Sequence, residues 1–168
     1  MTSTYEKIAT NTLGSATATV TFSSISGAYT DLVLIISALG ASASDYIKVN
    51  INSDTGSNYS NTALYGDGST ARSGRVSNQT FAYLTYQYFA STTEPNLVIA
   101  NFQNYSNATT YKTYLSRSNS QIATSGPDAI VGLWRSTSAI TSLSLARTGG
   151  GNFNSGSTFT LYGILKAA

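Results

Sequence analysis

Phe153-Asn-Ser-Gly-Ser-Thr-Phe-Thr-Leu-Tyr-Gly-Ile-Leu165, near the end of the 168-residue chain, is the stretch that decides the fold. Phe159, Leu161 and Leu165 share one face of an extended chain, because side chains alternate along a strand. The residues before it, 140–147, predict a second strand, and a loop rich in Gly and Asn separates the two. Since loose termini fray, we expect the last strand to be paired inside a sheet.

The composition extends this interpretation to the whole chain. Only 10% of the residues are charged, against roughly a quarter in a typical globular protein. Polarity comes instead from 26 serines and 24 threonines, whose short side chains compete with a helical backbone for hydrogen bonds. Two glutamates and four lysines are too few to cover the exposed faces of amphipathic helices. The composition therefore predicts an all-β protein.

Alternating or continuous apolar patterns predict about nine or ten strands. Their spacing of about 10–15 residues is typical of a sandwich or barrel. No linker or internal repeat divides the chain, so we expect a single domain over residues 1–168. The expected strands are 4–10, 16–22, 32–39, 46–52, 80–90, 96–104, 109–118, 129–135, 140–147 and 158–165.

A long segment between two of these strands, residues 53–77, is rich in Gly, Ser, Asn and Asp and is predicted to be a loop. Loops of this length are usually functional or disordered. Leu64 and Tyr65 form an apolar island within it. We expect them to pin the loop onto the domain's own sheet or onto a neighbouring subunit, with Arg72 and Arg75 near that contact.

Tyrosines give the clearest indication of a binding surface. The segment Phe81-Ala-Tyr-Leu-Thr-Tyr-Gln-Tyr-Phe89 places Tyr83 on one face of a strand and Tyr86 and Tyr88 on the other. Tyrosine combines a large apolar area with a polar tip, which suits protein interfaces and stacking on sugars. Packing in the core with ordinary cross-strand pairs is the alternative explanation. These three tyrosines are the candidate binding residues.

Trp134 and Arg135 alternate in the same way near the end of another expected strand. Trp134 is expected in the core. Arg135 then lies on the opposite face, where it is a candidate for a subunit contact.

Several kinds of chemistry are excluded or disfavoured. The chain has no histidine and no cysteine, which excludes the usual zinc sites and Ser-His or Cys-His catalysis. Asp54 and Asp67 are the nearest approach to a glycosidase pair, and Asp54 with Asn58 to a calcium site, but turn residues with solvated side chains are favoured. We therefore expect no enzyme activity, no metal and no cofactor.

Nucleic acid and membrane are not expected partners either. The net charge is only +2, and the basic residues are dispersed along the chain. No segment approaches the roughly 18 consecutive apolar residues that indicate a membrane-spanning helix.

Both ends of the chain resemble a known family. The pieces concerned are Tyr5-Glu-Lys-Ile-Ala-Thr10, Tyr29-Thr-Asp-Leu-Val-Leu-Ile-Ile36, Ala139-Ile-Thr-Ser-Leu143 and Gly156-Ser-Thr-Phe-Thr-Leu-Tyr-Gly-Ile164. They resemble small β-sandwich virion structural proteins of tailed bacteriophages, including marine and cyanophage types. The resemblance covers roughly the first 36 and last 40 residues. Together with the chain length, it favours an antiparallel jelly-roll-like β-sandwich.

The resemblance also implies a function. It places the protein in the virion, with other capsid or tail proteins as partners. Because no coiled-coil stem precedes the first strand, we expect a capsid decoration (cement) subunit, and analogy with other phage decoration proteins suggests a homo-oligomer such as a trimer. The alternative is a receptor- or glycan-binding module of the tail or fibre, with a host-surface glycan as its ligand.

Overall fold

Twelve antiparallel β-strands build the described part of the protein. The computed structural model describes residues 4–40, 45–66, 68–86, 92–119 and 126–165. No helix occurs among these residues, so the predicted all-β class is confirmed. The strands are β1 (Tyr5–Thr12), β2 (Thr19–Phe22), β3 (Asp31–Ala38), β4 (Ile47–Ile51), β5 (Tyr59–Gly66), β6 (Ala71–Gln79), β7 (Ala82–Tyr83), β8 (Asn96–Phe102), β9 (Lys112–Asn119), β10 (Asp128–Trp134), β11 (Leu143–Arg147) and β12 (Thr158–Ile164).

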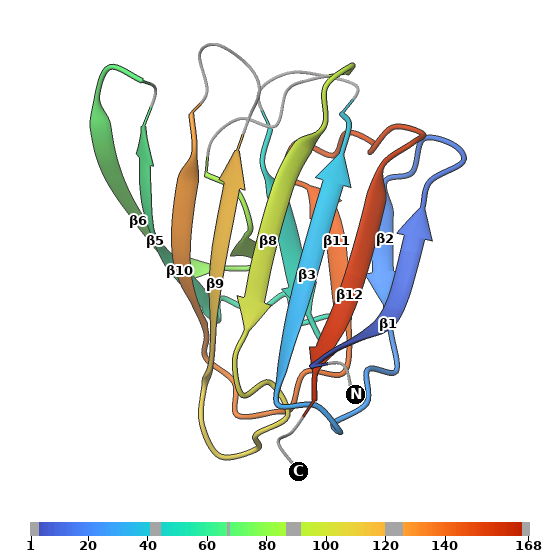
Figure 1. The fold of residues 1–168 in the computed structure, drawn as a ribbon. Helices are drawn as coiled ribbons and strands as arrows, with labels where there is room; N and C mark the ends of the chain where they lie inside the picture. Colours follow the sequence, from blue (N-terminus) through green and yellow to red (C-terminus); the bar gives the residue numbers. More distant parts are fainter. Residues whose placement is uncertain (1–3, 41–44, 67, 87–91, 120–125, 166–168) are drawn as a thin grey trace.

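The strands form two facing sheets of unequal width (Figure 1). The large sheet has the order β1-β12-β3-β8-β9-β10-β5-β6, and the small sheet has the order β2-β11-β4-β7. Eight strands form a jelly roll, with β1-β12-β3-β8 facing β2-β11-β4-β7. The other four, β9, β10, β5 and β6, continue the large sheet past β8, and we call them the extension. The predicted jelly-roll-like sandwich is confirmed.

The C-terminal strand lies inside the large sheet. β12 pairs with β1 on one side and with β3 on the other. Phe159 and Leu161 point inward and are fully buried. The strand that decides the fold therefore closes the jelly roll.

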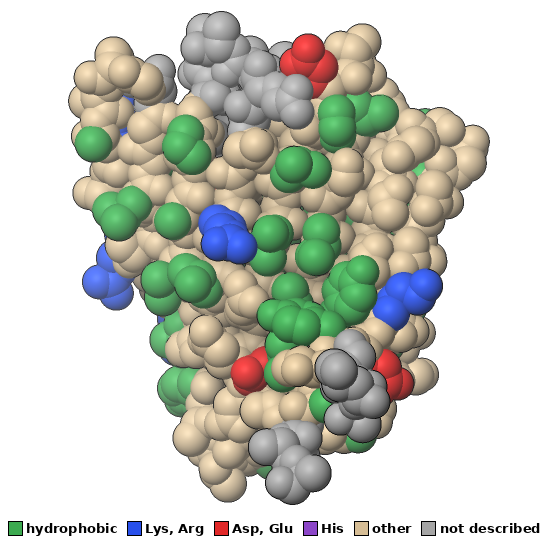
Figure 2. All heavy atoms as spheres, viewed as in Figure 1, with side chains coloured by type: hydrophobic (Ala, Val, Ile, Leu, Met, Phe, Trp, Pro, Cys, Tyr) green, Lys and Arg blue, Asp and Glu red, His purple; other side chains and the backbone are tan. Residues whose placement is uncertain are grey.

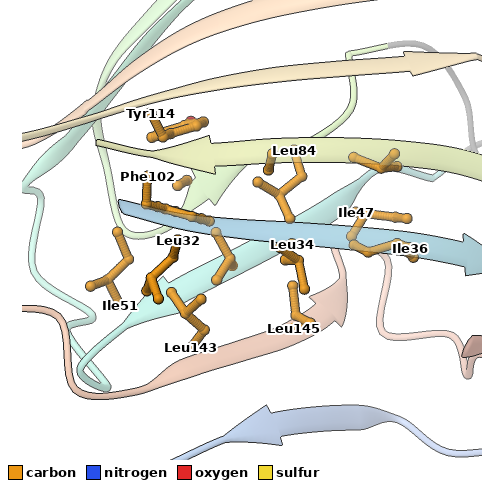
Figure 3. Close-up of a cluster of buried hydrophobic side chains, with 14 of the residues drawn as sticks. Leu32, Leu34, Ile36, Ile47, Ile51, Leu84, Phe102, Tyr114, Leu143 and Leu145 are labelled. Carbon is orange, nitrogen blue, oxygen red and sulfur yellow. The ribbon is translucent and has the colours of Figure 1, made fainter. Parts of the chain in front are cut away.

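The core fills the space between the two sheets. Leu32, Leu34 and Ile36 of β3 belong to the same buried cluster as Leu143 and Leu145 of β11 (Figure 3). Burying a side chain of this size contributes about 1.5–3 kcal/mol. Packing between β3 and β11 is therefore a main source of stability.

The expected loop over residues 53–77 is wrong, because most of it forms β5 and β6. These two strands account for the difference between the expected ten and the observed twelve. Tyr59, Asn61 and Ala63 point inward and are buried, so the period of two is present. Polar residues occupy half of the positions in β5, so this alternation could not be recognised from the sequence. β6 lies at the sheet edge, where it needs few apolar side chains.

Several expected strands are shorter than predicted; those expected over 109–118 and 140–147 begin only at Lys112 and Leu143. In the segment 80–90, only Ala82–Tyr83 form a strand among the described residues. The strand ends there because the N–H groups of Leu84 and Thr85 both donate hydrogen bonds to the same carbonyl, that of Ile47. The strand expected over 16–22 begins only at Thr19. Two residues earlier, Thr17 pairs with Phe153 in an isolated bridge and does not belong to the strand.

Candidate functional site

The candidate tyrosines are brought together on the inner side of the extension. We call Tyr46, Tyr65, Phe81, Tyr83 and Tyr86 the aromatic cluster. Neighbouring ring centroids lie 4.9–6.1 Å apart, and the contact between Tyr65 and Tyr86 measures 5.2 Å. All five side chains are partly exposed.

Tyr83 and Tyr86 do not lie on opposite faces as predicted. Their ring centroids are 6.1 Å apart in an edge-to-face contact. The prediction assumed a continuous strand, but the chain bends directly after Tyr83. Tyr88, the third candidate, lies outside the described residues.

The segment that carries Tyr83 and Tyr86 is held by polar side chains of β9 and β10. Tyr114 and Ser116 donate hydroxyl hydrogen bonds to the carbonyls of Tyr83 and Leu84, at 2.9 and 2.7 Å. The backbone N–H of Tyr86 donates to Asp128 Oδ2 at 2.6 Å. The small sheet has only four strands, so this segment covers the inner face that the extension would otherwise expose. The aromatic cluster therefore has a structural role in closing the sandwich.

Leu64 and Tyr65 point in opposite directions from β5. Tyr65 joins the aromatic cluster, whereas Leu64 faces outward and is 63% exposed. Cross-strand pairing places Arg72 opposite Tyr65 and therefore on the inner side. Arg75 pairs with the outward-facing Thr62 instead. The four expected contact residues are thus divided between two faces of the extension.

Arg135 makes its contacts within its own chain. Its guanidinium donates to the carbonyl of Ser57 and to Asn78 Oδ1, the latter at 3.0 Å. These bonds link the turn before β5 to the end of β6.

Asp54 is not the solvated turn residue that the sequence suggested. Its carboxylate accepts hydrogen bonds from Trp134 Nε1 at 2.7 Å, Asn58 Nδ2 at 2.9 Å and the N–H of Gly56 at 2.8 Å. Burial raises the pKa of Asp54, but these three bonds outweigh it and the pKa is lowered overall. With both oxygens engaged, the carboxylate serves the fold. No group of three carboxylates that could hold a metal occurs among the described residues.

The feature that sequence reasoning missed is an apolar outer face on the large sheet. Ile35, Leu97, Leu115, Val131 and Leu64 are between 39% and 63% exposed and come from five neighbouring strands, β3, β8, β9, β10 and β5. Hydrophobic side chains are spread over this face, with a basic group among them (Figure 2). We call this surface the apolar face.

The strand register places four of these residues in two neighbouring rows across the sheet and Leu97 in a third row beside them. In one row, Leu115 and Val131 are direct cross-strand neighbours, and Val33 lies two strands beyond Leu115. The next row runs Ile35, Ile99, Arg117, Ala129 and Leu64, each paired with the one before it. Asn101 interrupts the first row and Arg117 the second, so the apolar side chains lie in neighbouring groups around these two polar residues.

The small sheet has a different outer surface. Thr21 and Ser144 share a hydrogen bond of 3.0 Å across β2 and β11, and Asn50 and Lys48 follow on β4. These polar side chains are what water-facing strands normally carry. Among the described residues, the exposed large aliphatic side chains therefore gather on the large sheet, and patches of this kind are common at interaction surfaces.

A shallow hollow of about 380 Å³ lies in the apolar face. Leu97, Ile99 and Arg117 line it, together with Asn119, Pro127, Ser118 and Asp128 at one end. Asp128 is itself buried, and its oxygens accept bonds from Tyr86 N and Ser118 Oγ. The hollow thus combines apolar walls with one exposed guanidinium.

Comparison with known proteins adds no assignment to this geometry. No protein-family model matches the chain, and no curated protein matches it. Among the described residues, no helix is long and apolar enough to cross a membrane.

Proposed function

We propose that the protein is a non-enzymatic structural subunit of a phage virion, most specifically a capsid decoration (cement) protein that binds another virion protein through the apolar face. The exposed apolar side chains of the large sheet are the observation that carries the proposal. The resemblance of both chain ends to phage virion proteins supports the location.

The size of the whole outer surface of the large sheet, in which the apolar face covers five of the eight strands, supports a stable contact. Eight strands about 4.8 Å apart and about seven residues long, at about 3.3 Å per residue, give a surface of roughly 800 Å². A standard protein–protein interface buries about 800 Å² on each partner. The large sheet therefore offers enough area for specific binding without help from a loop or an arm.

The carboxylates also favour a structural role over catalysis. Asp45 forms an ion pair with the buried Arg147, with Oδ2 and Nε 3.3 Å apart. Asp54 and Asp128 each accept hydrogen bonds that hold neighbouring segments in place. Each of these acids is occupied in supporting the fold.

Particles of the phage that carries this gene, produced without the protein, provide the test. Purified protein should bind them saturably in co-sedimentation, and cryo-electron microscopy of decorated particles should place it on the capsid. The double variant Leu115→Ser/Val131→Ser should bind at least about tenfold more weakly, because it removes the middle of the apolar face. Ala146→Ser, on the outer surface of the small sheet, is the matched control and should bind normally. Density on the tail, or no binding by the unmodified protein, would contradict the proposal.

The second candidate function is a receptor- or glycan-binding module of the tail or fibre. The partly exposed tyrosines of the aromatic cluster favour it, because tyrosine rings suit stacking on sugars. A glycan array separates the two functions. Specific binding that Tyr83→Ala abolishes would support the second function, whereas an array without signal, combined with capsid density, supports decoration.

A further inference from the structure

Arg117 lies in the middle of the apolar face. The register places it between Ile99 on β8 and Ala129 on β10, and Leu115 lies two residues away on the same side of β9. Among the described residues it makes no hydrogen bond and no ion pair, and its side chain is exposed. A charged group is thus surrounded by the side chains that a docked partner would cover.

Covering the apolar face would remove water from this guanidinium. A buried charge without a partner strongly opposes binding, so a stable complex requires an acceptor opposite Arg117. A carboxylate is the best match, because it accepts two parallel hydrogen bonds from one guanidinium.

The other charges on this surface argue against a second copy of the chain. Lys7 and Arg75 also point outward from the large sheet, one near each edge. Asp31, at one end of β3, and the exposed Glu6 beside Lys7 on the edge strand β1 are the acids of the described strands that lie at this surface, and Asp31 Oδ1 already accepts the N–H of Asn104 at 2.6 Å. Two such faces in contact would bring basic groups together, which disfavours self-association there.

We infer that the apolar face binds an unlike protein, whose surface presents a carboxylate to Arg117 beside an apolar side chain that enters the hollow lined by Leu97 and Ile99. This inference rests on the proposed function and specifies the chemistry of its partner. Any homo-oligomer of the protein then uses a different surface.

Three substitutions at one position test the pairing on particles produced without the protein. Arg117→Lys keeps the charge and should weaken binding only modestly. Arg117→Glu and Arg117→Met should each weaken it at least about tenfold, because both leave the partner's carboxylate buried without a cation. Arg75→Met, near the edge of the same face, is the matched control. All four variants should keep the wild-type melting temperature, since both arginines are exposed.

The Met variant distinguishes the possible results. If the contact were apolar alone, Arg117→Met would bind as well as the wild type or better, and the inference would be overturned while the proposed function stood. Failure of the wild-type protein to bind the particles overturns both.

Sedimentation velocity tests whether the apolar face is a contact between copies of this chain. Leu115→Ser/Val131→Ser should leave the oligomeric state of the free protein unchanged. Dissociation of an oligomer by this variant would identify the face as a self-contact and overturn the inference.

Discussion

Trp134 donates its indole N–H to the carboxylate of Asp54, with Nε1 and Oδ2 2.7 Å apart. Trp134 is the last residue of β10 and is buried, whereas Asp54 belongs to the turn between β4 and β5. The bond therefore joins the jelly roll to the extension at the point where the chain passes from one to the other. Tyr59, stacked on Trp134 with ring centroids 6.5 Å apart, donates its hydroxyl to the carbonyl of Asp54 at 3.0 Å.

Replacing Asp54 by Ala should destabilise the protein by about 1–3 kcal/mol, because it leaves the buried indole N–H and its neighbours without their acceptor. Thermal unfolding followed by circular dichroism measures this loss. Ser53→Ala, at the adjacent exposed position, is the control and should change little. An unchanged melting temperature in Asp54→Ala would show that water replaces the carboxylate without cost.

The lowered pKa of Asp54 adds a pH dependence. Because the folded-state pKa lies below the ordinary value of 3.8, the contribution of Asp54 to stability is present above that value. It is lost as the pH falls through the folded pKa. The melting temperature of the wild type should therefore fall more steeply below about pH 4 than that of Asp54→Asn, which has no proton to gain. Parallel pH profiles of the two proteins would refute this explanation.

At Gly132 and at Gly163, a tyrosine ring packs so closely against the backbone that a Cβ atom would have no room. A Cβ atom at Gly132 would lie 1.9 Å from the ring of Tyr114, and one at Gly163 would lie 2.3 Å from the ring of Tyr29. Tyr114 is 1% exposed and cannot move aside, whereas Tyr29 is partly exposed. Gly132→Ala should therefore destabilise by about 3 kcal/mol or more, and Gly163→Ala by less. Urea unfolding of both variants checks the order, and the reverse order would contradict it.

Leu64 and Tyr65 should respond differently to the same substitution. Tyr65→Ser removes a ring from the aromatic cluster and should lower stability by about 1–2 kcal/mol, while Leu64→Ser should stay within about 0.5 kcal/mol of the wild type. Melting temperatures of the two single variants measure the difference. Equal losses would mean that Leu64 has a contact within its own domain.

The apolar face should be visible in the isolated protein. Leu115→Ser/Val131→Ser removes side chains that are 41% and 59% exposed, so stability should change by no more than about 1 kcal/mol in total. The double variant should nevertheless have a clearly shorter retention time on a hydrophobic-interaction column than the wild type and Ala146→Ser. Unchanged retention would mean that these side chains do not form the main apolar surface of the free protein.

Strands with strong alternation could be predicted from the sequence. Ile47, Val49 and Ile51 are buried as expected, and so are Phe159 and Leu161. Alternation could not reveal β5 and β6, because Asn61 and Gly74 occupy inward positions and leave few apolar residues to count.

The alternation of apolar and polar residues also could not predict the apolar face. Residues 32–39 are apolar on both sides, and this pattern is typical of a strand that is covered on both faces. Val33 is indeed buried, but Ile35, two residues along, is 39% exposed. Whether a second apolar side is covered depends on which elements pack over it, and that is a property of the assembled fold.

The extension changes the width of the large sheet without changing the jelly roll. β5, β6, β9 and β10 enter the chain between strands of the jelly roll and widen one sheet, while the four-stranded sheet behind stays the same. Width can thus be gained or lost by insertion without rewiring the eight-stranded framework. If the large sheet binds a partner as proposed, the two inserted strand pairs set how much of that partner it covers, while the eight-stranded jelly roll carries the surface.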